Sequence, residues 1–170
     1  MPSRGFPPIA APDARVLILG SLPGQASLAA GQYYAQPQNA FWRVMGDLFD
    51  AGLDLPYDQR AARLRANGIA LWDVCAAAVR PGSLDAAIDR DSIVTNDFVA
   101  FLAVHPRIRH VCANGGTAHQ LYARRVRPGL PASQAALPLH RLPSTSPAHA
   151  SLRYAQKLER WRVLQELLRQ

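Results

Sequence analysis

The chain has 170 residues, of which 49% are hydrophobic and 18% are charged, and this length is typical of one compact domain. A chain of this size buries about 70% of the surface that its unfolded form exposes, so it needs no disulfide framework. No apolar run approaches the roughly 18 to 20 residues that cross a bilayer, and Met1 to Pro12 lacks the apolar stretch of a secretion signal. We therefore expect a cytoplasmic monomer without membrane association, nucleoid-associated if the source is bacterial.

The charge is strongly positive, with a formal net charge of +7 and an isoelectric point near 10.2. Such a balance favours a polyanionic partner, nucleic acid first, with acidic small molecules as the alternative. Lys157 is the only lysine and lies in a stretch with the period of an ordinary amphipathic helix. Imine chemistry, which needs a free amine, is therefore not expected.

Metal and redox chemistry find little support in the residue types. Cys75 and Cys112 lie in apolar runs and are expected to be reduced core thiols. Two cysteines are too few for an all-cysteine iron–sulfur cluster, and the five histidines show no metal-ligand spacing. We expect no metal and no cofactor.

The order of elements predicts an α/β fold. Residues 1–14 predict a flexible Pro-rich leader, and residues 15–170 a single domain. Short apolar runs predict four buried strands, the last weakened by Pro138, at residues 16–19, 69–72, 108–113 and 137–142. Helical periods alternate with them, at residues 41–49, 58–66, 96–104, 116–125 and 151–168. This alternation predicts a mostly parallel sheet covered by helices on both faces, a three-layer α/β/α arrangement.

Ligands of such sheets bind beyond the carboxyl ends of the strands, so the loops that follow the predicted strands are the candidate site. The first loop, residues 20–24, consists of Gly20, Ser21, Leu22, Pro23 and Gly24. Its glycines and proline bend the chain and leave amides free to face an anion or a base edge. It matches neither the dinucleotide fingerprint nor a P-loop, and a tight strand-to-helix turn is the alternative.

Residues 33–42 are rich in aromatic rings and side-chain amides, which suit a site that stacks on an uncharged heteroaromatic ring and bonds its edge. Tyr34 and Asn39 are the candidates here. Asn39 could instead cap the helix that follows, with Phe41 and Trp42 in the core.

Two later strands end in polar residues. Asp73 follows residues 69–72 and is placed to bind N–H groups of a ligand, although it could also cap a turn. Asn114 follows residues 108–113, and its Asn-Gly pair favours a turn.

The loop after the last strand supplies hydroxyls, prolines and one histidine, which are common phosphate-contacting groups. Its candidates are Ser144, Thr145, Ser146, Pro147, Ala148, His149 and Arg153. A Ser/Pro-rich linker is the alternative.

Three of these segments, in this order, make the chain similar to the uracil-DNA glycosylase superfamily, and to its hypoxanthine-DNA (deoxyinosine) glycosylase branch in particular. They are GSLPG at 20–24, GQYYAQPQNAFW at 31–42 and STSPAH at 144–149. The resemblance extends from about Arg15 to the final helix. It implies a parallel four-stranded sheet between helices and a base-excision repair enzyme.

The resemblance also implies roles for single residues. Tyr34 takes the position of the ring that stacks on a flipped base, and Asn39 that of the branch's catalytic asparagine. Leu22 stands where many other branches carry a catalytic Asp or Asn, which favours the hypoxanthine branch. Asp73 takes a position that reads the base edge, and residues 144–149 the segment that pinches the DNA backbone. His149 is a candidate partner of the leaving base.

One departure concerns the loop around Pro37, where relatives often carry His and Arg and this chain has Gln36 and Gln38. With lysine chemistry not expected, we predict a monofunctional glycosylase that hydrolyses the N-glycosidic bond of a flipped deaminated base, chiefly hypoxanthine, and leaves an uncleaved abasic site. The alternatives are a mismatch-type uracil-DNA glycosylase, a non-catalytic nucleic-acid binder, and a small nucleotide-binding enzyme that lacks the usual phosphate motifs.

Overall fold

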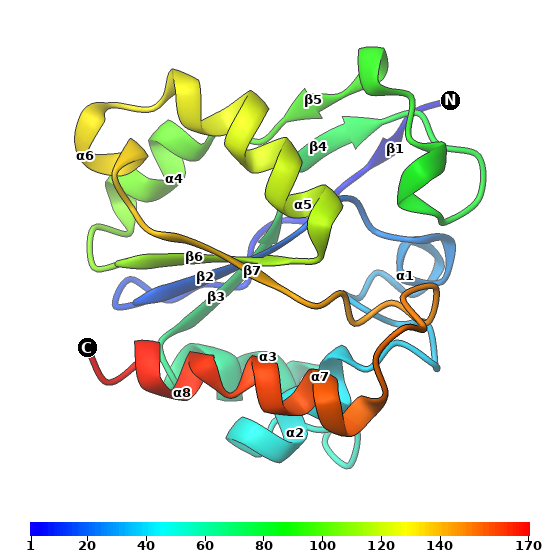
Figure 1. The fold of residues 1–170 in the computed structure, drawn as a ribbon, viewed down its shortest axis with the longest axis vertical. Coiled ribbons are helices and arrows are strands. Elements are labelled where there is room, and N and C mark those ends of the chain that lie inside the picture. The colour runs from blue at the N-terminus through cyan, green and yellow to red at the C-terminus, as the bar shows by residue number, and fades with distance from the viewer.

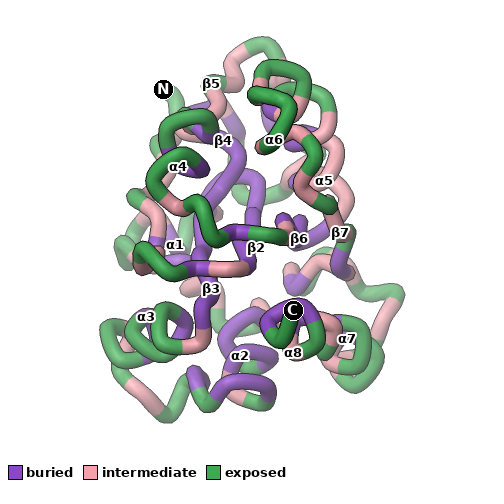
Figure 2. Tube along the Cα trace, turned by 90° about the vertical axis from the view of Figure 1, so that its left-hand side faces the viewer, coloured by how far each residue is buried: buried purple, intermediate pink, exposed green.

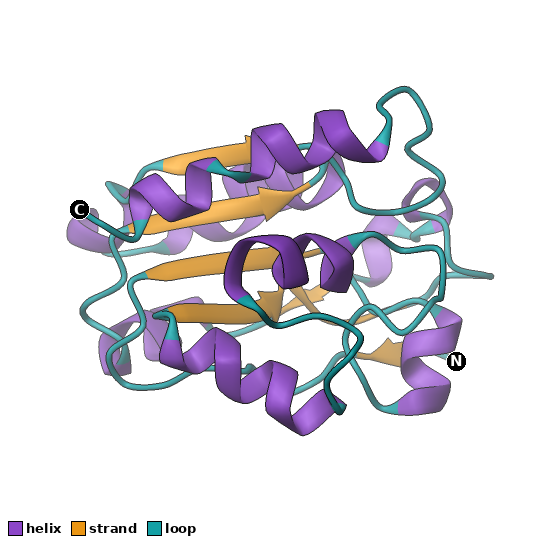
Figure 3. Ribbon diagram, turned by 90° about the horizontal axis from the view of Figure 1, so that it is seen from below, coloured by secondary structure: helices purple, strands orange, loops and turns teal.

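The computed structural model describes residues 1–170 and has a four-stranded sheet between two layers of helices (Figure 1). The strands are β2 (Val16–Gly20), β3 (Ile69–Asp73), β6 (His110–Asn114) and β7 (Leu139–Leu142), in the order β3-β2-β6-β7. All three pairings are parallel, and Figure 3 shows the four arrowheads pointing the same way. The expected three-layer architecture is confirmed.

The central strand β2 shows why the sheet is covered on both faces. All five of its residues are buried. Val16 and Ile18 belong to the core below the sheet in Figure 1, whereas Leu17 and Leu19 belong to the core above it. Successive side chains of a strand point to opposite faces, so a continuous apolar run requires two apolar layers.

Helices α2 (Phe41–Phe49), α3 (Tyr57–Ala66), α7 (Tyr154–Trp161) and α8 (Val163–Leu167) cover the lower face, and α4 (Phe98–Val104), α5 (Gly116–Leu121) and α6 (Ala132–Ala135) lie above the sheet (Figure 1). The short helix α1 (Gln25–Ala30) follows the loop after β2. A π-helical turn, Tyr122–Val126, continues α5, and 3-10 turns occur at Asp85–Ala87, Arg90–Ser92 and Arg127–Gly129. Figure 2 shows α2 largely buried and the outer surface of α3 exposed. No helix is long and apolar enough to cross a membrane.

Strand β7 forms despite Pro138, because the proline precedes the strand and offers its carbonyl to Val111 N at 2.9 Å. The missing N–H of Pro138 therefore interrupts no bond within β7.

The expected flexible leader is wrong for most of residues 1–14. Strand β1 (Ser3–Arg4) pairs with β4 (Cys75–Ala78), which also pairs with β5 (Val94–Thr95) in a small antiparallel sheet. Ile9 is buried and forms an antiparallel bridge with Leu71. These pairings are long-range, and a local proline count does not reveal them.

Candidate active site

At the start of the first loop, the backbone carbonyls are already hydrogen-bonded to the segment that follows β3. Gly20 O and Ser21 O accept hydrogen bonds from Val74 N and Cys75 N at 2.8 and 3.0 Å. The Ser21 hydroxyl donates to Asp85 Oδ1 at 2.6 Å. Leu22 is 6% exposed and packs into the core above the sheet, so its side chain faces the protein interior rather than a ligand.

Arg80 holds the same loop from the other side and was not found by sequence reasoning. Its guanidinium is buried and donates to Leu22 O at 3.4 Å and to Pro23 O, while its Nε donates to Gly82 O at 3.2 Å. Asp85 lies 3.8 Å away as its ionic partner. Only the tertiary structure distinguishes this arginine from the other arginines of the chain.

A strand-end cluster lies at the carboxyl edge of the sheet and consists of Gly20, Tyr34, Asp73 and Asn114. A Cβ on Gly20 would lie 2.4 Å from Asp73 Oδ1 and 2.8 Å from the Tyr34 hydroxyl, so the two polar groups approach the backbone at a place that only glycine permits. The Tyr34 hydroxyl and Asp73 Oδ2 are buried and have no hydrogen-bond partner. Unpaired buried polar atoms cost about 1–3 kcal/mol each, which makes this cluster a candidate ligand site.

Burial changes the acidity of both groups. Desolvation, reinforced by Asp85 and opposed by Arg80, raises the pKa of Asp73 to about 7. Desolvation also raises the pKa of Tyr34, with Asp73 adding to the rise and Asn114 opposing it. Asp73 can therefore exchange a proton near neutral pH, whereas Tyr34 stays a neutral phenol.

The Tyr34 ring is held from behind by Phe41. The rings stack with centroids 4.2 Å apart at 23°, and Phe41 has no exposed surface. Phe41 therefore supports Tyr34 and offers no ring face of its own. Tyr34 has φ of +54°, which is rare for an aromatic residue and costs energy that the surrounding contacts must supply.

Neighbouring residues supply those contacts. The Tyr33 hydroxyl donates to Pro7 O at 2.8 Å, and Tyr33 O accepts from Trp42 Nε1 at 2.7 Å. The leader thus anchors the residue that precedes Tyr34.

Asn39 lies just before the N-cap of α2 and faces a cavity. Its Oδ1 accepts a hydrogen bond from Phe41 N at 2.9 Å at the start of α2, which fixes the orientation of the side-chain amide. Its Nδ2 has no protein acceptor, and the residue lines an open cavity of about 410 Å³. The N-cap of α2 is Ala40, with no side-chain cap hydrogen bond, so Asn39 is not the cap; its contact with Phe41 N is a local turn that orients the amide for a ligand.

The loop after β7 is tied to both strand ends and α2. Thr145 is buried; its N–H donates to Asn114 Oδ1 at 3.0 Å, and its hydroxyl accepts from Asn114 Nδ2 at 2.9 Å. Thr145 O accepts from Ala40 N at 2.9 Å. Asn114 uses its side chain to hold this loop beside Asn39.

Two of the loop hydroxyls form its own turns. Ser144 Oγ accepts from Ser146 N at 3.1 Å, and Ser146 Oγ from Ala148 N at 3.2 Å. Pro147, Ala148 and Arg153 are exposed. The loop is thus exposed at one end and anchored by Thr145 at the other, an arrangement that suits contact with a large partner.

The cavity is lined by both Asn39 and His149. We call it the basic pocket; its lining is Pro37, Gln38, Asn39, Ala40, Arg43, Leu53, Thr145, Pro147, His149, Ala150, Leu152, Tyr154 and Lys157. Tyr34 and Asp73 are absent from it, so the predicted site consists of two neighbouring parts. Lys157 lies in a helix, as its amphipathic period predicted; its side chain is buried in the wall of this pocket, and its Nζ donates to Ser146 O at 3.3 Å.

Comparisons with known proteins agree with this geometry. The model of the Uracil DNA glycosylase superfamily matches residues 7–168. A protein named hypoxanthine DNA glycosylase from Methanosarcina acetivorans is 40% identical over 119 residues, which cover 69% of this chain and 74% of that protein. Its namesake from Methanosarcina barkeri is 39% identical over 116 residues, 68% of this chain and 72% of that protein.

A solved structure shares the whole fold. The solution NMR structure of a candidate uracil DNA glycosylase from Methanosarcina acetivorans superposes with a TM-score of 0.79 at 33% identity, covering 100% of both chains. With the family model matching nearly the full length, this chain belongs to the uracil DNA glycosylase superfamily.

Proposed function

We propose that the protein is a monofunctional DNA glycosylase that excises deaminated bases, chiefly hypoxanthine. The observation that carries this proposal is the position of Asn39, in an open pocket with the loop after β7 and beside a buried cluster with two unpaired polar atoms. The names of the two Methanosarcina relatives support hypoxanthine as the base.

The flipped base stacks on the Tyr34 face that Phe41 does not cover, and its edge meets Asp73. Extrusion costs a few kcal/mol, less for a base in a weakened pair. Hypoxanthine presents an N–H and a carbonyl on its pairing edge. Asp73, with a pKa near neutrality, can donate to the carbonyl when protonated or accept from the N–H when ionised.

Asn39 orients the attacking water, because its amide is fixed by Phe41 N. Positive charge develops on the sugar as the bond breaks, so a positioned water needs no strong base. Negative charge develops on the leaving base, where donors from the protein stabilise it. His149, in the same pocket, is the candidate for this contact.

The product is an abasic site that remains uncleaved. Strand cleavage by a lyase route begins with an amine that attacks the sugar aldehyde. The only lysine amine of the chain is engaged with Ser146 O.

A single-turnover assay tests the proposal with duplexes that contain hypoxanthine, uracil or xanthine. We expect hypoxanthine release, with strand breaks only after alkali, and a loss of about 10²- to 10³-fold in Asn39→Ala. Asn39→Ser is the matched control: a serine hydroxyl can accept the same local hydrogen bond from Phe41 N, so it should recover stability without recovering the rate.

Each other outcome identifies an alternative. Preference for uracil in mismatches would identify a mismatch-type uracil enzyme. Salt-sensitive DNA binding without release of any base would identify a non-catalytic binder. Release that survives Asn39→Ala would place catalysis on another residue.

A further inference from the structure

The charged residues that line the basic pocket are both cationic. They are Arg43 and Lys157, and the lining includes no Asp or Glu. Cationic groups that line a concave surface raise the local concentration of anions. The glycosylase reaction itself requires no such pair of cations at this place, so their function is open.

Lys157 carries an uncompensated charge. Its side chain is buried, and the molecule's ion pairs, Arg80–Asp85 and Glu159–Arg162, do not include it. Its single hydrogen bond goes to a neutral carbonyl, Ser146 O. A buried cation without a counter-ion is unfavourable, so an anion bound in the pocket would stabilise it.

Arg43 is positioned by stacking rather than by an ion pair. Its guanidinium carbon lies 3.6 Å from the centre of the Tyr154 ring, and the Tyr154 hydroxyl donates to Asp47. This stack joins α2 to α7 and limits the freedom of a long side chain, so less entropy is lost when Arg43 binds a ligand.

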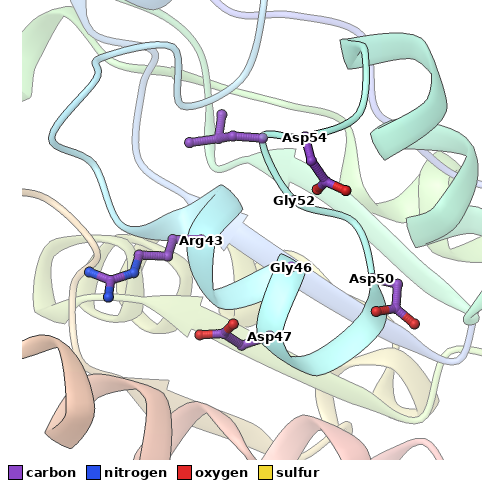
Figure 4. A pocket seen from close by; sticks show the side chains of 7 residues that line it. Arg43, Gly46, Asp47, Asp50, Gly52 and Asp54 are labelled. Atoms are coloured by element: carbon purple, nitrogen blue, oxygen red, sulfur yellow. The ribbon is translucent and has the colours of Figure 1, made fainter.

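An acidic hollow lies on the other side of Arg43. Its cavity of about 290 Å³ is lined by Arg43, Asp47, Asp50 and Asp54 together with Gly46, Gly52 and Leu53. Figure 4 shows the Arg43 side chain directed away from Asp50 and Asp54. Because the charged residues of the basic pocket are cationic and the hollow is lined by three carboxylates, an anion is attracted to the pocket and repelled from the hollow.

The neighbouring loop cannot supply these charges. Gln36 and Gln38 are neutral, and the side chain of Gln36 bonds both the side chain and the N–H of Gln38. The positive charge next to Asn39 therefore comes from the helices α2 and α7.

We propose that Arg43 and Lys157 form a subsite for a backbone phosphodiester of the damaged DNA strand, next to the flipped nucleotide. Arg43 offers a planar fork and Lys157 a point charge, both common phosphate ligands. This proposal rests on the proposed function for its DNA ligand. It assigns to two helix residues the positive charge that the neutral side chains of Gln36 and Gln38 lack.

The test measures binding to a duplex with a tetrahydrofuran abasic analogue, which needs no base excision, between about 50 and 200 mM salt. Lys157→Met keeps the buried stem, and Arg43→Gln keeps most of the side-chain length. Each should lower the salt-dependence slope by about 1 and weaken binding, while Lys157→Arg retains the slope. Arg124 is exposed on the π-helical turn above the sheet. Arg124→Gln is therefore the control: it removes the same amount of charge away from the pocket and should lower the salt-dependence slope less.

Unchanged slopes in folded Lys157→Met and Arg43→Gln proteins would overturn the subsite, and so would an equal reduction in Arg124→Gln. Thermal stabilisation by inorganic phosphate that depends on Lys157, without any effect of Lys157 on DNA binding, would assign the site to a free phosphate instead. Base release is measured separately, so an enzyme that excises no base but shows the altered slopes would refute the proposed function and keep a DNA-phosphate subsite.

Discussion

The strand-end cluster and the basic pocket are neighbouring parts of the candidate site that differ in burial and in charge. The cluster is buried and holds a carboxyl group with a raised pKa and a phenol, both with unpaired atoms. The pocket is open to solvent and positively charged. The difference separates two tasks: a dry site can discriminate a base by hydrogen bonds that water would weaken, and a wet cationic site can hold a charged backbone.

Asn39 connects the two parts through one hydrogen bond. Its Oδ1 binds the N–H of Phe41, and the Phe41 ring supports Tyr34. The residue proposed to position water is thus linked by one contact to the support of the ring proposed to stack on the base.

The largest effect on stability is expected at Arg80, whose side chain holds the loop at residues 20–24 through the carbonyls of Leu22 and Pro23. Arg80→Met leaves the Leu22 and Pro23 carbonyls without their donor and Asp85 without its ionic partner. We expect a loss of about 3–5 kcal/mol in the free energy of unfolding, measured by urea unfolding, because each buried carbonyl left unsatisfied costs about 1–3 kcal/mol. The ion pair adds little, since the Asp85 side chain is 42% exposed.

Arg124→Gln on the surface should cost less than about 0.5 kcal/mol and serves as the reference. A loss of similar size in Arg80→Met would mean that the arginine does not hold the first loop.

The second effect concerns the protonation of Asp73. Burial raises its pKa to about 7 from the ordinary value of 3.8, so between these values the native state binds more protons than the unfolded state. Stability therefore falls as pH rises through this window and levels off above pH 7, by at most about 4 kcal/mol at about 1.4 kcal/mol per pH unit. Asp73→Asn removes this loss and should be more stable than the wild type at pH 8, with a smaller difference at pH 5.

Unfolding by urea at the two pH values measures this difference. A wild-type advantage that grows from pH 5 to pH 8 would contradict a dry, proton-binding cluster.

A third, smaller effect is expected at Asn114, which links the strand-end cluster to the loop after β7 through Thr145. Asn114→Ala removes both hydrogen bonds to Thr145, at about 1 kcal/mol each. We expect a loss of about 2 kcal/mol and faster amide hydrogen exchange at residues 144–149, because the loop loses its buried anchor.

Asn96→Ala is the comparison, since Asn96 Nδ2 makes one bond, to Asp73 O at 2.8 Å, outside that loop. Exchange at residues 144–149 that is no faster in Asn114→Ala than in Asn96→Ala would show that other contacts hold the loop.

The local residue pattern predicted those helices and strands that are long enough to show a clear hydrophobic period. The runs at 16–19 and 69–72 became β2 and β3, and the helix at 41–49 has the expected bounds. The predicted helix at 151–168 is divided, with α7 and α8 meeting at Arg162. The two-residue strands β1 and β5 were missed because they are too short to show a period.

The site shows the same division. Sequence motifs singled out Asn39, His149, Tyr34 and Asp73 as candidates; the first three lie in loops, and Asp73 ends strand β3. They could not single out Arg80 or Lys157, because nothing near these residues in the chain distinguishes them. Their importance comes from tertiary contacts with backbone carbonyls, Leu22 O at 58 residues from Arg80 and Ser146 O at 11 residues from Lys157.

The sequence by itself determined the order of strands and helices, the positive charge and the motifs that place the chain in its family, because these depend on local residue pattern and composition. The tertiary structure alone decided which groups lost their water and their partners. Burial of Asp73 and Lys157 is a property of several elements packed together, and it is burial that shifts a pKa or leaves a cation ready for an anion.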